Sequence, residues 1–108
     1  MRWCRHNDNG AAQAALSDQG GGRFALEGEL SFASVPALLR RGAALFAGQG
    51  AIELDLSGVR RADSAGLALL VEWLAQANRL NRQLDFRHVP DQILRMAKVG
   101  GLEDILSL

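Results

Sequence analysis

Three short segments of this chain alternate apolar and polar side chains, and this alternation constrains the fold more than any other feature. They are RFALEGEL (residues 23–30), AIELDLS (residues 51–57) and QLDFRHV (residues 83–89). A period of two residues is typical of a strand with one buried and one solvated face. Parallel strands that are buried on both faces are usually continuous apolar runs instead. We therefore predict a small sheet with helices packed mainly on one face.

A segment with helical spacing follows each predicted strand. Ser34 is a suitable N-cap for the first helix, and Pro36 suits its first turn. The second helix covers about residues 64–80, and the third begins at Pro90 and ends near Val99. The order β-α-β-α-β-α predicts an α/β fold with a mainly parallel sheet and right-handed crossovers.

The two ends of the chain are less strongly patterned. Residues 1–11 are predicted to be a flexible tail, and residues 12–108 a single domain. Residues 11–17 are compatible with a short edge strand or with a helical turn, and residues 102–108 with a short final helix or a tail.

Composition narrows the class of partner and the compartment. The chain has 108 residues, and its 12 basic side chains balance 12 acidic ones, so no net field attracts nucleic acid or an anionic membrane. The single cysteine, Cys4, cannot form an internal disulfide, which favours a reducing compartment. No apolar run approaches the ~20 residues of a membrane span, and no signal peptide is predicted. We expect a cytoplasmic protein.

The helix predicted over residues 64–80 is apolar on two sides. At about 100° per residue, the stripe predicted to face the sheet comprises Leu67, Leu70, Val71 and Leu74. The second stripe comprises Leu69, Trp73 and Leu80. This second stripe either packs against a neighbouring helix of the same chain or is exposed as a partner site. Because Trp is enriched at interface hot spots, we favour the exposed alternative.

The turn before this helix, ADSAGL, contains a serine with two possible roles. Either Asp63 or Ser64 can cap the helix by accepting a hydrogen bond from a free backbone N–H group. Gly66 allows another segment to approach closely. If Ser64 is not merely a cap, its hydroxyl is contacted by a partner or is phosphorylated. A phosphate there would gain from the helix dipole but be repelled by Asp63.

The sequence lacks the patterns that carry catalysis. Its two histidines, His6 and His88, are far apart in the chain, and no pair has metal-ligand spacing. There is no G-x-S-x-G nucleophile elbow and no G-x-x-x-x-G-K-[ST] phosphate loop. We predict a protein that is not an enzyme and has no metal or cofactor.

With these residues in view, residues 20–105 resemble STAS domains (sulfate transporter and anti-sigma factor antagonist). The most specific part is IELDLSGVRRADSAGLALLVEWLAQAN, residues 52–78: a strand, a short connection, D-S-x-G-L and a helix. The resemblance implies a small sheet with helices mainly on one side, which agrees with the alternation described above.

Two branches of the family are compatible with this sequence. Anti-sigma factor antagonists are phosphorylated at the serine that corresponds to Ser64, which switches their binding to a serine kinase. The MlaB-type small cytoplasmic subunit of the Mla phospholipid ABC transporter instead docks on the ATPase subunit. The segments at residues 26–39, 66–74 and 94–106 resemble the transporter subunit more closely. Ser64 stands where many such subunits have threonine, which keeps the antagonist alternative open.

The favoured resemblance implies a non-enzymatic subunit that supports the ATPase of a transporter maintaining outer-membrane lipid asymmetry. It would lie at the inner membrane through its partner, without inserting. The residues expected to contact the ATPase are Ser64, Ala65, Leu69, Glu72 and Trp73, with Asp63 and Gly66 shaping the turn. A weaker alternative is a small-molecule-sensing module that holds an anion at the helix N-terminus.

Overall fold

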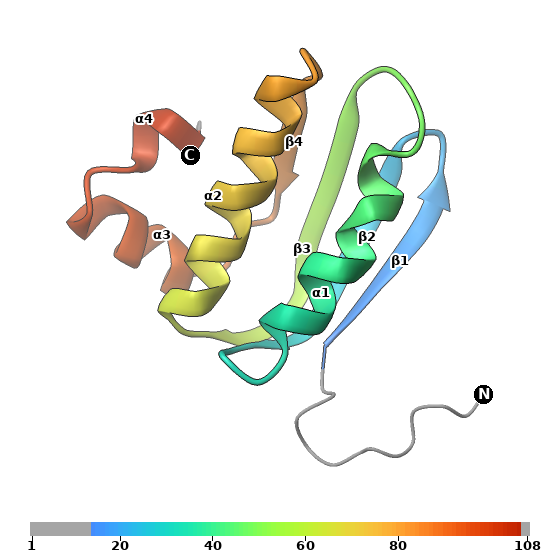
Figure 1. The fold of residues 1–108 in the computed structure, drawn as a ribbon. Coiled ribbons are helices and arrows are strands. Elements are labelled where there is room, and N and C mark those ends of the chain that lie inside the picture. Colours follow the sequence, from blue (N-terminus) through green and yellow to red (C-terminus); the bar gives the residue numbers. More distant parts are fainter. Residues whose placement is uncertain (1–13, 107–108) are drawn as a thin grey trace, which may run out of the picture.

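The computed structural model describes residues 14–106 and contains a four-stranded sheet (Figure 1). Its strands are β1 (Ala15–Gly20), β2 (Arg23–Leu30), β3 (Ile52–Ala62) and β4 (Leu84–Arg87), in the order β1-β2-β3-β4. β1 pairs with β2 antiparallel, while β2, β3 and β4 are parallel. The predicted α/β class with a mainly parallel mixed sheet is therefore confirmed. The predicted tail, residues 1–11, lies outside the described residues.

The helices lie between and after the strands. They are α1 (Val35–Arg41), which continues as the 3₁₀ helix η3 (Gly42–Phe46), α2 (Ser64–Arg79), α3 (Asp91–Val99) and α4 (Glu103–Leu106). Between residues 14 and 106, no helix has the length and apolar character needed to cross a membrane. Of the alternatives left open for the ends, the edge strand is correct for residues 15–17 and the short helix for residues 103–106.

The strand order explains why the helices gather on one side. From β2 to β3 to β4, each crossover steps to the next strand in the same direction across the sheet. Successive right-handed crossovers that step in one direction place their helices on the same face. Figure 1 shows α1 and α2 side by side across that face, with α3 and α4 beyond α2.

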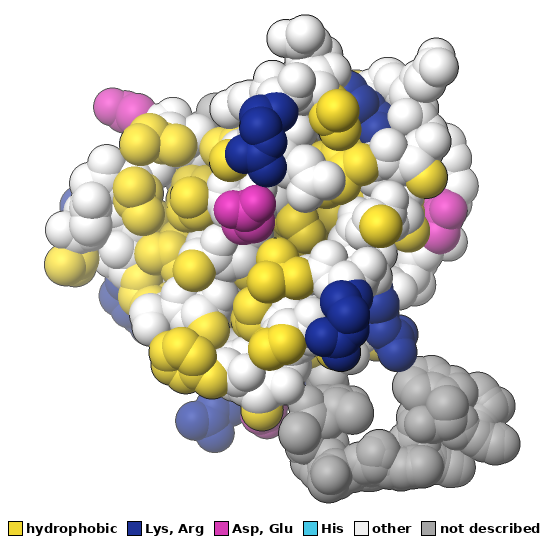
Figure 2. Space-filling model, in the orientation of Figure 1, with side chains coloured by type: hydrophobic (Ala, Val, Ile, Leu, Met, Phe, Trp, Pro, Cys, Tyr) yellow, Lys and Arg dark blue, Asp and Glu magenta, His cyan; other side chains and the backbone are white. Residues whose placement is uncertain are grey.

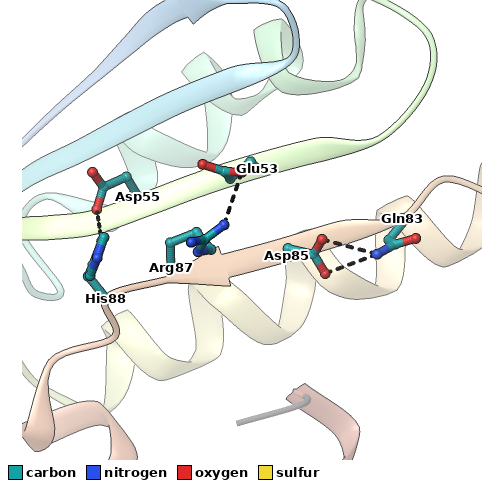
Figure 3. Close-up of polar contacts among 6 residues, drawn as sticks. All are labelled: Glu53, Asp55, Gln83, Asp85, Arg87 and His88. Atoms are coloured by element: carbon teal, nitrogen blue, oxygen red, sulfur yellow. Dashed lines mark hydrogen bonds and ion pairs between the residues drawn. The ribbon is translucent and has the colours of Figure 1, made fainter.

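The predicted alternation matches the two faces of the sheet. The side chains under the helices are buried and comprise Phe24, Leu26, Leu30, Ile52, Leu54, Leu56 and Leu84. Phe86, at the edge strand, is half-buried against this core. Side chains at the intervening positions, such as Glu53 and Asp55, point away from the helices (Figure 3). The sheet therefore has one apolar face and one charged face, as predicted.

Strand β3 is longer than predicted, because it ends at Ala62 and not at Ser57. Its pairing with β2 shifts register twice, and each shift places one extra residue in β3. The buried positions consequently advance from Leu56 to Val59 and then to Ala62, by three residues instead of two. This interruption of the two-residue period is the reason that the sequence pattern indicated a connection there.

Helix α2 is rotated relative to its predicted orientation. The buried residues of α2 are Ala65, Gly66, Leu69, Leu70, Trp73 and Ala77. Leu69 and Trp73 are each only 1% exposed, so the prediction that they form an exposed stripe is wrong. Leu70 is buried as predicted, whereas Leu67, Val71 and Leu74 are only partly buried. Leu80, the third member of the second stripe, is 49% exposed.

Two close contacts, each at a glycine, explain this rotation. A Cβ at Gly66 would lie 2.8 Å from the Cβ of Leu30, so this part of α2 sits directly on β2. A Cβ at Gly42 in η3 would overlap the indole of Trp73. Trp73 therefore packs against the backbone of a neighbouring helix, which was the alternative that the sequence analysis did not favour.

The burial of Trp73 predicts a large effect on stability. Trp73→Ala is expected to lower the free energy of unfolding by about 3–5 kcal/mol, because it leaves a cavity between α2 and η3. Leu80→Ala, a matched change at the exposed end of the same predicted stripe, is expected to cost less than about 1 kcal/mol. Urea denaturation followed by circular dichroism measures both. Similar losses in the two variants would contradict this packing.

Candidate docking site at the start of helix α2

The turn between β3 and α2 is fixed by Asp63. Its Oδ1 accepts a hydrogen bond of 2.8 Å from the backbone N–H of Ala65, which caps the helix. The backbone N–H of Asp63 donates to the carbonyl of Leu30 at 3.0 Å and ties the turn to the end of β2. Of the two predicted candidates, Asp63 is therefore the cap and Ser64 is not.

Ser64 is the first residue of α2 and is exposed. Within residues 14–106, its hydroxyl takes part in no hydrogen bond, whereas the hydroxyl of Ser34 donates to the carbonyl of Glu29 at 2.7 Å. Because capping is done by Asp63, Ser64 has no structural hydrogen bond to satisfy. Its hydroxyl is available to a partner or to a modifying enzyme.

A groove of about 660 Å³ runs beside Ser64, between the start of α2 and α3. Leu67 of α2 and Met96 and Val99 of α3 give it apolar walls. Val99 is 91% exposed, the highest value among the exposed large hydrophobic residues. In Figure 2, which shows the helical face, hydrophobic surface is gathered over α2, α3 and α4. This is the kind of surface that marks a partner site.

Gln92 fixes one end of this groove. Its side-chain carbonyl accepts a hydrogen bond of 2.9 Å from the backbone N–H of Ala62, the last residue of β3. The first turn of α3 is thereby joined to the strand that leads into α2. Gln92 also lines an adjoining pocket of about 250 Å³, whose other walls include Glu29 and Arg61. The groove and this pocket share the end of β3.

The charged face of the sheet is different, because its side chains pair with one another (Figure 3). The contacts are Arg87 Nη1 with Glu53 Oε1 at 3.3 Å, His88 Nδ1 with Asp55 Oδ1 at 3.1 Å, and Gln83 Nε2 with Asp85 Oδ2 at 3.0 Å. The pKa of Asp55 is lowered, first because the Ser57 backbone N–H donates to its carboxylate and second because His88 contacts it. All three contacts are exposed; the first two connect β3 with β4 and His88, and the third lies within the β4 segment.

The chemistry available in the described ranges is limited. The ring of His88 makes only its contact with Asp55 among residues 14–106, and the Ser57 backbone binds the same carboxylate. In a catalytic triad, the serine hydroxyl contacts the histidine ring nitrogen that does not contact the carboxylate, which here is Nε2 of His88. In this part of the chain, no group of three His, Cys, Asp or Glu side chains could hold a metal ion.

The predicted site residues fall into an exposed group and a buried group. Asp63 and Ser64 line the groove, and Glu72 is exposed further along α2, where it pairs with Arg79 at 3.5 Å. The other predicted residues, Ala65, Gly66, Leu69 and Trp73, are buried. Burial of Leu69 and Trp73 removes them from any direct contact surface, and Gly66 approaches β2 closely as predicted.

The contribution of α3 to the site was not predicted from the sequence. Met96 and Val99 are three residues apart, and Met96 comes three residues after Ile93. Ile93 and Ala97 form the buried line of α3. An apolar pair beside an already complete buried line indicates extra hydrophobic surface. That signal was present in the segment LRMAKV, but its position beside Ser64 depends on the fold.

The sheet order, the helices on one face and the D-S-A-G turn together define a STAS domain. The family model described as "Mlab, STAS domain" matches residues 14–107. The chain therefore belongs to the MlaB group of STAS domains. It is 35% identical over 86 residues to the "Intermembrane phospholipid transport system binding protein MlaB" of Haemophilus influenzae, an alignment that covers 76% of this chain and 82% of the relative.

Two solved structures are similar in fold. An anti-sigma factor antagonist from Mycobacterium paratuberculosis has a TM-score of 0.64 and 23% sequence identity, over 85% of this chain and 80% of that one. The murine anion transporter Slc26a9 in its inward-facing state also has a TM-score of 0.64, with 18% identity, over 81% of this chain and 15% of the transporter. At these identities the likeness concerns the fold alone.

The capping geometry predicts unequal effects at two adjacent residues. Asp63→Ala is expected to lower the free energy of unfolding by about 1 kcal/mol, because the Ala65 N–H loses its acceptor. Ser64→Ala is expected to change it by less than about 0.5 kcal/mol. Thermal or urea denaturation of both variants tests this assignment, and a greater loss at Ser64 would show that the serine is the cap.

Proposed function

We propose that this chain is a non-enzymatic STAS subunit that binds and supports the ATPase of a Mla-type phospholipid ABC transporter. In this role it would help to maintain outer-membrane lipid asymmetry. It would be cytoplasmic and attached to the inner membrane only through its partner. Family membership and the name of the Haemophilus influenzae relative, a binding protein of an intermembrane phospholipid transport system, support the proposal.

The observation that carries this proposal is the apolar groove beside Ser64. Three partly or fully exposed apolar side chains, Leu67, Met96 and Val99, line one depression in the surface. The charged face of the sheet, by contrast, has Glu53 in contact with Arg87 and Asp55 in contact with His88. Since exposed apolar surface costs free energy in water, the groove is the part of the molecule that gains most from a protein partner.

The proposed contact set is revised accordingly. Ser64 and Glu72 remain in it, because both are exposed on α2. Leu67, Met96 and Val99 replace the buried Leu69 and Trp73 as the apolar part. The turn residues Asp63 and Gly66 support the surface by fixing where α2 begins and how closely it sits on β2.

Two variants test docking on the ATPase. Val99→Asp and Ser64→Glu are each expected to weaken binding to the ATPase subunit of the same genome by at least about tenfold, because each places a charge in an apolar contact. The matched control is Leu39→Asp, which introduces the same charge at an exposed aliphatic residue of α1, 43% exposed and not among the residues lining the groove. Co-purification and biolayer interferometry measure the affinities.

These measurements also decide whether docking matters for activity. ATP hydrolysis by the reconstituted transporter should rise on addition of the wild-type chain and of Leu39→Asp, but much less with Val99→Asp. The surface assignment would be wrong if all three variants bound as tightly as the wild-type chain.

A second candidate function rests on the free hydroxyl of Ser64. An exposed serine in the first turn of a helix is a suitable phosphoryl acceptor, because the helix dipole stabilises the added negative charge. The chain would then be an anti-sigma factor antagonist whose partner is an anti-sigma factor serine kinase. Asp63 beside Ser64 opposes this role through like-charge repulsion.

Mass spectrometry after incubation with a serine kinase of this class separates the two functions. An antagonist is expected to gain one phosphoryl group on Ser64, and Ser64→Ala is the control that remains unmodified. An unmodified wild-type chain, under conditions in which the kinase modifies its own antagonist, would leave the transporter function as the supported one.

A further inference from the structure

Arg95 has an unusual position among the basic side chains of this protein. It is exposed and lines the groove beside Met96 and Val99. Arg87 and Arg79 pair with Glu53 and Glu72 on their own faces, and no other basic side chain among the described residues lines this groove. Within residues 14–106, Arg95 takes part in no hydrogen bond or ion pair. A free cation therefore stands at the wall of an apolar depression.

Among residues 14–106, the carboxylates around the groove form no ion pair with this cation. Asp63 also lines the groove, but its Oδ1 is held by the backbone N–H of Ala65 at the start of α2. Glu29 lies in the adjoining pocket and stands opposite Arg61 in the register of β2 and β3. Arg95 is thus the one basic side chain that this groove offers to a ligand, and the carboxylate of Asp63 beside it is engaged at the helix cap.

The apolar part of the groove suits a protein side chain. Val99 is 91% exposed, so the groove is a depression on the surface and not an enclosed chamber. Its volume of about 660 Å³ leaves room for several side chains of one partner segment. Met96 has a flexible, polarisable side chain that can adjust to the shape of an inserted residue.

We propose that this groove receives an amphipathic segment of the partner in which a bulky apolar residue is flanked by a carboxylate, and that Arg95 selects that carboxylate. The inference rests on the proposed function, because the segment is assigned to the ATPase subunit. The apolar residue contacts Leu67, Met96 and Val99, as in other complexes where a helix lies in a groove. The ion pair with Arg95 sets the register of the segment and the salt dependence of association.

Charge reversal at Arg95 tests the proposal. Arg95→Glu is expected to weaken binding to the purified ATPase subunit by at least about tenfold at low salt, and to remove most of the decrease in affinity that the wild-type chain shows on adding salt. Arg95→Gln should give an intermediate loss. The matched control is Lys98→Glu, because Lys98 is an exposed cation of the same helix that does not line the groove. It should bind within about twofold of the wild-type chain.

A compensating change identifies the carboxylate. Hydrogen exchange of the complex locates the ATPase segment that becomes protected, and each Asp or Glu in it is changed to Lys. One such variant is expected to bind Arg95→Glu more tightly than it binds the wild-type chain. Circular dichroism of the Arg95 variants should match that of the wild-type chain, since the side chain is exposed.

The outcomes separate this inference from the function on which it rests. If the wild-type chain does not bind the ATPase, the proposed function fails and the inference fails with it. If the wild-type chain binds and Val99→Asp does not, but Arg95→Glu binds as tightly as wild type, only the inference fails. Binding of the wild-type chain to anionic phospholipid vesicles that is lost in Arg95→Glu, with unchanged ATPase affinity, would show that the groove recognises a membrane instead.

Discussion

The packing of α2 against β2 and η3 determines which side chains of that helix this protein exposes to solvent. At Gly66 the helix approaches β2 closely enough that even a methyl group would be crowded, and at Gly42 the backbone of η3 receives the indole of Trp73. These contacts fix the rotation of α2 about its axis. Leu69 and Trp73 consequently face inward, while Ser64 and Leu67 are left at the edge of the helix that borders α3.

The crossover geometry gives the molecule two unlike sides. Because β2, β3 and β4 follow one another in the same direction, the helices collect on one face and the other face remains open. The side chains of the open face satisfy one another through the ion pair of Glu53 with Arg87 and the contact of Asp55 with His88. The helical side keeps an apolar groove with no such internal partner. This contrast is the basis for proposing that a partner docks on the helical side.

The general architecture could be predicted from the sequence, but the composition of the site could not. Alternating residues such as Phe24 and Leu26 define strand faces locally, and Pro90 marks a helix start without reference to the rest of the chain. The rotation of α2 could not be assigned in this way, because the helix is apolar on both sides and the choice depends on Gly42, more than twenty residues earlier. The groove likewise needs Gln92 to bring α3 against the end of β3.

The two register shifts in β3 bear on how this strand tolerates changes in length. In a regular strand, loss of one residue reverses the direction of every side chain that follows it. Between Leu56 and Ala62 the strand already contains extra residues relative to β2, so a single deletion at one of those bulges would restore regular pairing and leave the later side chains on their original face. Homologues that are one residue shorter here would keep the same hydrophobic interior and the same position of the start of α2 against β2.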